Sequence, residues 1–83
     1  MRPVTKLTLV SRRYCHLCTE MAVALERLAA DFDVAIEVVD VDADAALEAL
    51  YDELVPVLLH DGHELCHYFL DASKVRDYLS EIR

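Results

Sequence analysis

Two cysteines separated by two residues, Cys15 and Cys18, are the feature that most constrains this chain. They lie between a short apolar run, Lys6–Val10, and a segment in which apolar residues recur at helical spacing. On the first turn of a helix, cysteines three positions apart share one face, and their Cα atoms lie near the ~5.5 Å that a disulfide prefers. We therefore expect the pair to form and release a disulfide with little movement of the backbone.

The start of a helix favours the ionised form of a cysteine. Unpaired backbone N–H groups and the positive end of the helix dipole stabilise a thiolate there and lower the pKa of a thiol from its usual ~8.5. We expect Cys15, nearer the helix tip, to be a nucleophile and Cys18 to be the resolving cysteine of a thiol–disulfide exchange. The candidates for stabilising the thiolate are the neighbouring residues Arg12, Arg13, Tyr14 and His16.

The rest of the chain predicts one α/β domain over residues 1–83, since the length leaves room for only one. The order is β-α-β-α-β-β-α, with strands expected at 6–10, 34–41, 57–60 and 64–68 and helical periodicity over 17–32, 47–54 and 75–82. The first two strands should be parallel. The run Val34–Val41 is nearly continuous in apolar character, which predicts a strand covered on both faces.

Polar residues at the ends of these segments predict caps and a tight turn. Asp42 or Asp44 is expected to cap the second helix, whose buried face would hold Leu47, Leu50, Tyr51 and Leu54, and Asp71 is expected to cap the last helix. Asp61-Gly62 predicts a two-residue hairpin loop.

With that loop, His60 opposes His63, Leu59 opposes Glu64, Leu58 opposes Leu65 and Val57 opposes Cys66. This register places Cys66 and His67 beside Val57 and Pro56, at the same end of the sheet as the cysteine pair. Cys66 is interpreted as a small half-buried hydrophobe, with a redox role as the alternative. We interpret His60 and His63 as solvated residues of the hairpin.

The charge of the chain excludes some partners. A net charge of −8, from 8 basic and 16 acidic residues, would repel the phosphates of nucleic acids and of anionic membranes. The segment 31–53 carries only acidic charges, which we interpret as a solvated face. Arg2, Lys6, Arg12 and Arg13 precede the first cysteine with no acid among them, which predicts a locally positive site.

The N-terminal apolar run is too short for the core of a signal peptide or for a membrane span. Three cysteines do not make a closed disulfide framework, and in a reducing compartment a closely spaced pair is typically catalytic or metal-binding. We therefore expect a cytoplasmic protein, and we expect a monomer without a bound cofactor.

Val55-Pro56 precedes the third predicted strand. The proline either ends the preceding helix or forms a cis peptide bond, which only an X-Pro bond adopts at low cost. A cis bond would turn the backbone N–H and C=O of Val55 outward, where an extended substrate can pair with them as an added strand.

Two stretches, Tyr14-Cys15-His16-Leu17-Cys18 and Val55-Pro56-Val57, resemble those of glutaredoxins, and more narrowly of the short bacterial glutaredoxin-like proteins. The resemblance spans nearly the whole chain. It implies a thioredoxin-like fold, with a four-stranded mixed sheet flanked by three helices, and a cis bond before Pro56. It also implies a disulfide oxidoreductase whose co-substrate is glutathione or whose substrate is a protein disulfide.

The chain departs from the glutaredoxin pattern near the expected substrate. Glutaredoxins usually have Pro-Tyr between the cysteines and a Gly-Gly turn after the last strand, where this chain has His16-Leu17 and Tyr68-Phe69. Without those glycines the close approach of backbone to glutathione is missing, and the two aromatic residues are expected to reshape the groove. The candidate substrate-binding residues are Val55, Pro56, Cys66, His67, Tyr68 and Asp71, the last toward the amine of glutathione.

Two other classes of function stay open at this stage. One is an iron–sulfur or metal-binding protein, in which Cys66, His67 or a second subunit completes the ligands around Cys15 and Cys18. The other is a non-catalytic module that binds a partner through the acidic surface of its helices.

Overall fold

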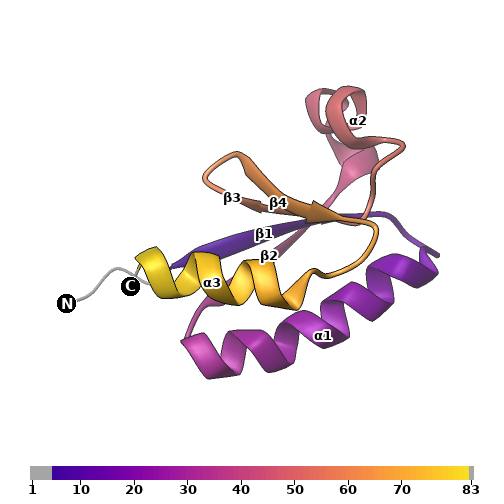
Figure 1. The fold of residues 1–83 in the computed structure, drawn as a ribbon. Coiled ribbons are helices and arrows are strands. Elements are labelled where there is room, and N and C mark those ends of the chain that lie inside the picture. Colours follow the sequence, from indigo (N-terminus) through magenta and orange to yellow (C-terminus); the bar gives the residue numbers. More distant parts are fainter. Residues whose placement is uncertain (1–4, 83) are drawn as a thin grey trace.

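Four strands form one mixed sheet in the order β2-β1-β3-β4 (Figure 1). The strands are β1 (Lys6–Ser11), β2 (Ala35–Asp40), β3 (Val57–His60) and β4 (His63–His67). β1 pairs in parallel with β2 and antiparallel with β3, and β3 pairs antiparallel with β4. The structure is a computed structural model that describes residues 5–82, so Arg2 of the predicted basic segment lies outside the described residues.

Three helices flank this sheet, with α1 (His16–Phe32) and α3 (Ala72–Ile82) on one face and α2 (Ala45–Tyr51) on the other (Figure 1). The order β-α-β-α-β-β-α is confirmed, with one addition, the short 3-10 turn η1 (Val41–Ala43) between β2 and α2. Within residues 5–82, no helix has the length and apolar character that crossing a membrane requires.

Each face of the sheet has its own apolar core. Residues spaced three and four apart on α1, such as Met21, Leu25 and Leu28, are buried against the sheet, as the helical spacing predicted. The full cluster on this face is Leu7, Leu9, Met21, Leu25, Leu28, Leu58, Leu65, Val75 and Leu79. On the α2 face, the buried cluster is Val10, Val41, Val57 and Leu59, with Leu47, Tyr51 and Leu54 packed partly against it.

The expectation that β2 is covered on both faces is wrong. β2 is an edge strand of the sheet, and Val38 is 59% exposed, although Val39 packs partly against the cluster on the α2 face. The helix α2 has only seven residues, and the buried cluster beneath it consists of residues from β1, β3 and η1 rather than β2. Leu50 was expected on the buried face of this helix but is 65% exposed, because Leu47 and Tyr51, one turn apart, occupy the side that faces the sheet.

The hairpin confirms the predicted turn but corrects the register beyond it. Asp61 and Gly62 both have positive φ, 49° and 83°, as the two-residue loop requires. His60 faces His63 and Leu59 faces Glu64, as predicted.

Between Leu58 and Leu59 the register shifts by one residue. Leu58 therefore faces Cys66 rather than Leu65, and Val57 faces His67 rather than Cys66. The extra residue of this bulge is Leu65, which is buried in the core cluster.

Aspartates cap the helices of the second half of the chain. Asp44 Oδ1 accepts hydrogen bonds from the backbone N–H groups of Ala46 at 2.8 Å and Leu47 at 3.2 Å, so Asp44 rather than Asp42 caps α2. Asp71 Oδ1 accepts from the N–H of Lys74 at 3.1 Å at the start of α3, as predicted. These bonds satisfy N–H groups that the first turn of a helix leaves unpaired.

Candidate active site

Cys15 and Cys18 form a disulfide at the N-terminus of α1, with their Cα atoms 5.2 Å apart. Cys15 is the N-cap residue of this helix, and its Sγ accepts a hydrogen bond from the backbone N–H of Cys18 at 3.2 Å. Cys18 lies on the first turn and is only 4% exposed, whereas Cys15 is half-buried. Cys15 is thus the more accessible of the two residues, and its sulfur lies where a helix stabilises negative charge.

The chain enters this site through a bend at Tyr14, which has a φ of 59°. This left-handed conformation is uncommon for a residue with a bulky side chain. The side chain of Tyr14 is fully exposed, and that of Arg13 beside it is also exposed. Neither residue therefore shields the disulfide from solvent.

Arg12 bonds to residues of η1 and of the end of α2 rather than to the cysteine pair. Its guanidinium donates to both carboxylate oxygens of Asp42, each at 2.9 Å, and also to the carboxylate and the backbone carbonyl of Asp52. The bond from Arg12 holds the pKa of Asp42 below its usual range. The positive charge predicted to stabilise the thiolate is here balanced by two carboxylates, and Arg12 ties the segment before Cys15 to η1 and α2.

His16 also differs from the prediction that it adds charge at the sulfurs. Its Nε2 lies 3.1 Å from Oε1 of Glu20, one helical turn further along α1, and its side chain is largely exposed. The locally positive site expected from the sequence is therefore reduced, because Asp42 and Asp52 accompany Arg12 and Glu37 accompanies Lys6.

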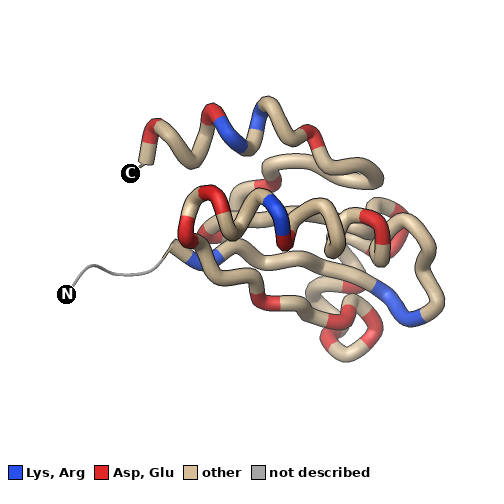
Figure 2. Tube along the Cα trace, turned by 90° about the horizontal axis from the view of Figure 1, so that it is seen from below, with Lys and Arg blue, Asp and Glu red and all other residues tan. Residues whose placement is uncertain are grey.

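Acidic residues are spread along the described trace rather than gathered on one element (Figure 2). Several acids of the segment 31–53 pair with cations from distant parts of the chain, which refines the interpretation of a purely solvated acidic face. Beside the pairs of Arg12, these are Asp31 with Arg76 at 2.8 Å and Glu37 with Lys6 at 3.3 Å.

Pro56 is fully buried, and its peptide bond with Val55 is cis. The ladder between β1 and β3 ends at the pair Val10 and Val57, so it does not include Val55. The backbone N–H of Tyr68 donates to the carbonyl of Pro56 at 2.8 Å, and the hydroxyl of Tyr68 donates to the carbonyl of Glu53 at 2.7 Å. Two bonds thus fix Tyr68, which has a φ of 64°, beside Pro56.

The remaining predicted substrate-binding residues have structural partners. Cys66 is half-buried, and this burial raises the pKa of its thiol. His67 Nδ1 lies 3.0 Å from Oε2 of Glu64, within the same strand. One carboxylate oxygen of Asp71 is used by the cap of α3. The corrected register places His67 and Tyr68, rather than Cys66, next to Val57 and Pro56.

A groove of about 240 Å³ lies between α1 and the segment that follows β4. Tyr68 and Phe69 were predicted to reshape a groove, whereas Glu20, Met21, Ala24 and Leu70 were not among the predicted site residues. Since α1 and residues 68–70 are far apart in the sequence, no local pattern indicates that they meet. The groove is lined by Leu17, Glu20, Met21, Ala24, Tyr68, Phe69 and Leu70.

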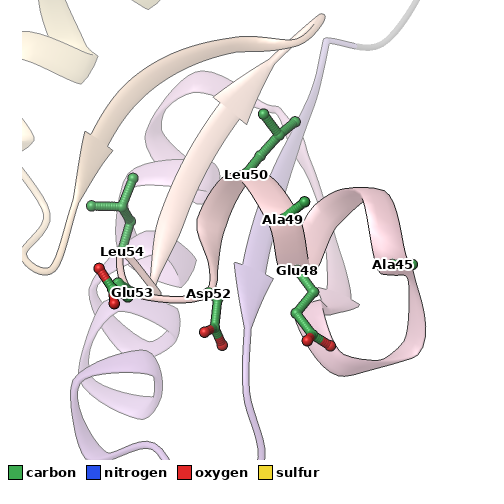
Figure 3. A pocket seen from close by; sticks show the side chains of 7 residues that line it. All are labelled: Ala45, Glu48, Ala49, Leu50, Asp52, Glu53 and Leu54. Atoms are coloured by element: carbon green, nitrogen blue, oxygen red, sulfur yellow. The ribbon is translucent and has the colours of Figure 1, made fainter.

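A second hollow, of about 620 Å³, follows α2 and contains none of the predicted site residues (Figure 3). The carboxylates of Glu48 and Asp52 point to one side of α2, and Leu50 points to the other (Figure 3). Asp52 is already bonded to Arg12. Among residues 5–82, no group of three or more His, Cys, Asp or Glu side chains is arranged to hold a metal ion.

Comparison with known proteins connects this geometry to a family. A family model described as "Glutaredoxin-like domain (DUF836)" matches residues 6–80. The chain is similar to the solved structure of protein Ne2328 from Nitrosomonas europaea, with 38% identity, 94% of each chain covered and a TM-score of 0.84. It is also similar to protein XcR50 from X. campestris, with 43% identity, 90% of this chain and 96% of that chain covered, and a TM-score of 0.67.

A more distant neighbour, thioredoxin 1 from Thermosipho africanus, is 22% identical over 93% of this chain and 97% of its own, with a TM-score of 0.64. At that identity it shows a shared fold, which confirms the predicted thioredoxin-like architecture. No protein of curated function matches the chain. With residues 6–80 matched, from the start of β1 almost to the end of α3, the chain belongs to the glutaredoxin-like domain family.

Proposed function

We propose that this protein is a thiol–disulfide oxidoreductase that uses Cys15 as its nucleophile and Cys18 as its resolving cysteine. The observation that carries the proposal is the hydrogen bond from the N–H of Cys18 to Cys15 Sγ at the N-cap of a 17-residue helix. A thiolate at that position is stabilised by the same N–H group and by the positive end of the helix dipole. The described first turn of α1 contains no acidic residue that would oppose this charge.

The exchange proceeds in two balanced steps. The Cys15 thiolate attacks one sulfur of a substrate disulfide, forms a mixed disulfide with it and expels the other substrate sulfur as a thiolate. Cys18, deprotonated at the time of attack, then displaces the remaining substrate sulfur and forms the Cys15–Cys18 disulfide. Two electrons pass from the dithiol to the substrate, and a thiol donor outside this chain restores the reduced pair.

The substrates are glutathione mixed disulfides or protein disulfides. Val55, beyond the end of the β1–β3 ladder, is the backbone position at which an extended substrate would add as a strand. His67, Tyr68 and Asp71, at the end of β4 and in the segment after it, are candidate contacts for the same substrate. We further propose that the protein acts as a monomer in the cytoplasm, without a resident cofactor.

Substitution of each cysteine tests the assignment. Turnover of a disulfide substrate with a thiol donor should be lost in Cys15→Ser. In Cys18→Ser the protein should accumulate as a mixed disulfide at Cys15, detectable as an added substrate mass in intact mass spectrometry. Cys66→Ala serves as the matched control and should keep turnover within about twofold, because the observed register places Cys66 opposite Leu58 rather than beside Pro56. Full turnover by Cys15→Ser would overturn the proposal.

A further inference from the structure

Hydrogen bonds within the protein fix one side of the groove between α1 and residues 68–70. Leu17, which separates the two cysteines in sequence, lines the groove on the α1 side. On the opposite side Tyr68 is fixed by its two hydrogen bonds, to the carbonyls of Pro56 and Glu53. Two lining residues thus adjoin the proposed active site: Leu17 lies between the two cysteines in the sequence, and Tyr68 is bonded to Pro56.

The lining of this groove is chemically uneven. The side chains of Leu17, Met21, Ala24 and Leu70 are apolar, and Phe69 is 67% exposed. A ligand that covers such an aromatic ring buries apolar surface, and this burial favours binding. Among the described lining residues Glu20 carries the single formal charge, and it is negative.

We propose that this groove receives an apolar side chain adjacent to the disulfide cysteine of a polypeptide, so that the redox pair selects protein disulfides over those of glutathione. This inference rests on the proposed function and names the substrate class of that same site. The covalent steps are unchanged, with Cys15 forming the bond to the polypeptide sulfur and Cys18 releasing it.

Glutathione lacks what the groove offers to bind. The residue that follows its cysteine is glycine, which has no side chain to fill an apolar groove. Glutathione also carries two carboxylates and one ammonium group at neutral pH, which is a net negative charge. The formal charge of −8 on the chain repels this negative charge, and Glu20, which lies beside His16, offers it no cation in the groove. A polypeptide with a leucine beside its cysteine and no neighbouring acid has neither disadvantage.

A pair of peptides that differ only at the position after the cysteine tests this selection. Each peptide carries 5-thio-2-nitrobenzoate on its cysteine, so that attack by Cys15 releases a coloured thiolate. The Cys18→Ser, Cys66→Ala double variant stops the reaction at the mixed disulfide. We expect the peptide with leucine to react about tenfold faster than the peptide with glycine, as the burial of part of one leucine side chain allows.

Two single substitutions in that background identify the groove as the cause. Phe69→Ala should reduce the ratio of the two rates to about twofold, since it removes apolar surface from the groove. Because Phe69 is largely exposed, its truncation leaves the buried core intact. Leu50→Ala is the matched control, an equally exposed apolar residue on α2, and should leave the ratio unchanged.

The uncharged 2-hydroxyethyl disulfide separates failure of this inference from failure of the proposed function. If Cys15 reacts with it but the leucine and glycine peptides react at equal rates, the groove has no selective role and the inference is overturned. The inference is also overturned if Leu50→Ala lowers the ratio as much as Phe69→Ala. If Cys15 reacts with none of the disulfides, the proposed function itself fails.

Discussion

Burial divides the three cysteines of this chain into different chemical environments. Cys15 is partly exposed at a helix tip, Cys18 is buried on the first turn of that helix, and Cys66 is half-buried on β4. Desolvation is the main cause of the raised pKa of Cys66, because an apolar environment disfavours the thiolate. Cys66 should therefore remain a neutral thiol under conditions in which Cys15 reacts.

Alkylation of the reduced protein checks this difference. At pH 7, iodoacetamide should modify Cys15 at least tenfold faster than Cys66, since only the thiolate is nucleophilic. Peptide mass spectrometry after timed quenching measures the two rates separately. Equal rates at Cys15 and Cys66 would contradict the assignment of Cys15 as the activated thiol.

The raised pKa of Cys66 also predicts a loss of stability in alkali. Because the folded-state pKa lies above the unfolded value of about 8.5, the folded state holds the proton more tightly. The contribution of the protonated Cys66 thiol to the free energy of unfolding is fully present below about pH 8.5. This contribution is lost as the pH rises through the folded-state pKa. The free energy of unfolding of the wild type should thus fall more steeply above about pH 9 than that of Cys66→Ala, as denaturant titrations would measure.

Among the helices, α3 begins with a residue that has two proposed roles. Asp71 caps this helix and is also a candidate contact for the substrate. Asp71 Oδ1 accepts the N–H of Lys74, a role that needs the oxygen but not its charge. Asp71→Ala should lower the free energy of unfolding by about 1 kcal/mol, the usual cost of losing a capping oxygen. Asp71→Asn keeps a capping oxygen and should be nearly as stable as the wild type. If the Asp71 carboxylate also binds the amine of glutathione, Asp71→Asn should raise the KM for glutathione disulfides but not the KM for other disulfides.

The contacts of Arg12 join the segment after β1 to η1 and to the C-cap of α2, and they make that junction sensitive to acid. Arg12 lowers the pKa of Asp42, so the carboxylate contributes to stability above its unfolded pKa of about 4 and the contribution is lost as the pH falls through the folded-state value. The thermal midpoint of the wild type should exceed that of Asp42→Asn at pH 7, and the difference should shrink below about pH 4. Asp77→Asn, at an exposed site on α3, is the control and should show no comparable dependence.

For the whole molecule, the formal charge of −8 governs encounters with charged disulfides. Raising the ionic strength from about 10 to 150 mM shortens the screening length from about 30 to 8 Å. The rate with anionic glutathione disulfide should therefore rise by a few-fold, and the rate with cationic cystamine should fall. The rate with uncharged 2-hydroxyethyl disulfide should stay constant, as stopped-flow measurements at several salt concentrations would test. Equal salt dependence for all three would show that the net charge does not control the encounter.

Local patterns predicted the order of the elements because their causes are themselves local. The helical spacing of Met21, Leu25 and Leu28, the Asp61-Gly62 turn and the cap at Asp71 each depend on residues within a few positions of one another. Two predictions of burial that depended on neighbours from other elements failed. The exposure of Val38 and Leu50 depends on which residues lie across from them, and those are distant in the chain.

The features of the candidate site also have either local or long-range causes. The amino-acid sequence alone determined that Cys15 and Cys18 stand at the start of a helix, since spacing and periodicity are properties of one continuous segment. Three features follow from long-range packing: Arg12 bonds to Asp42 and Asp52, the bulge at Leu65 moves Cys66 away from Val57, and residues 68–70 form a groove with α1. Those contacts join residues that the sheet brings together across the chain, and no short-range pattern encodes which of several suitable partners will meet.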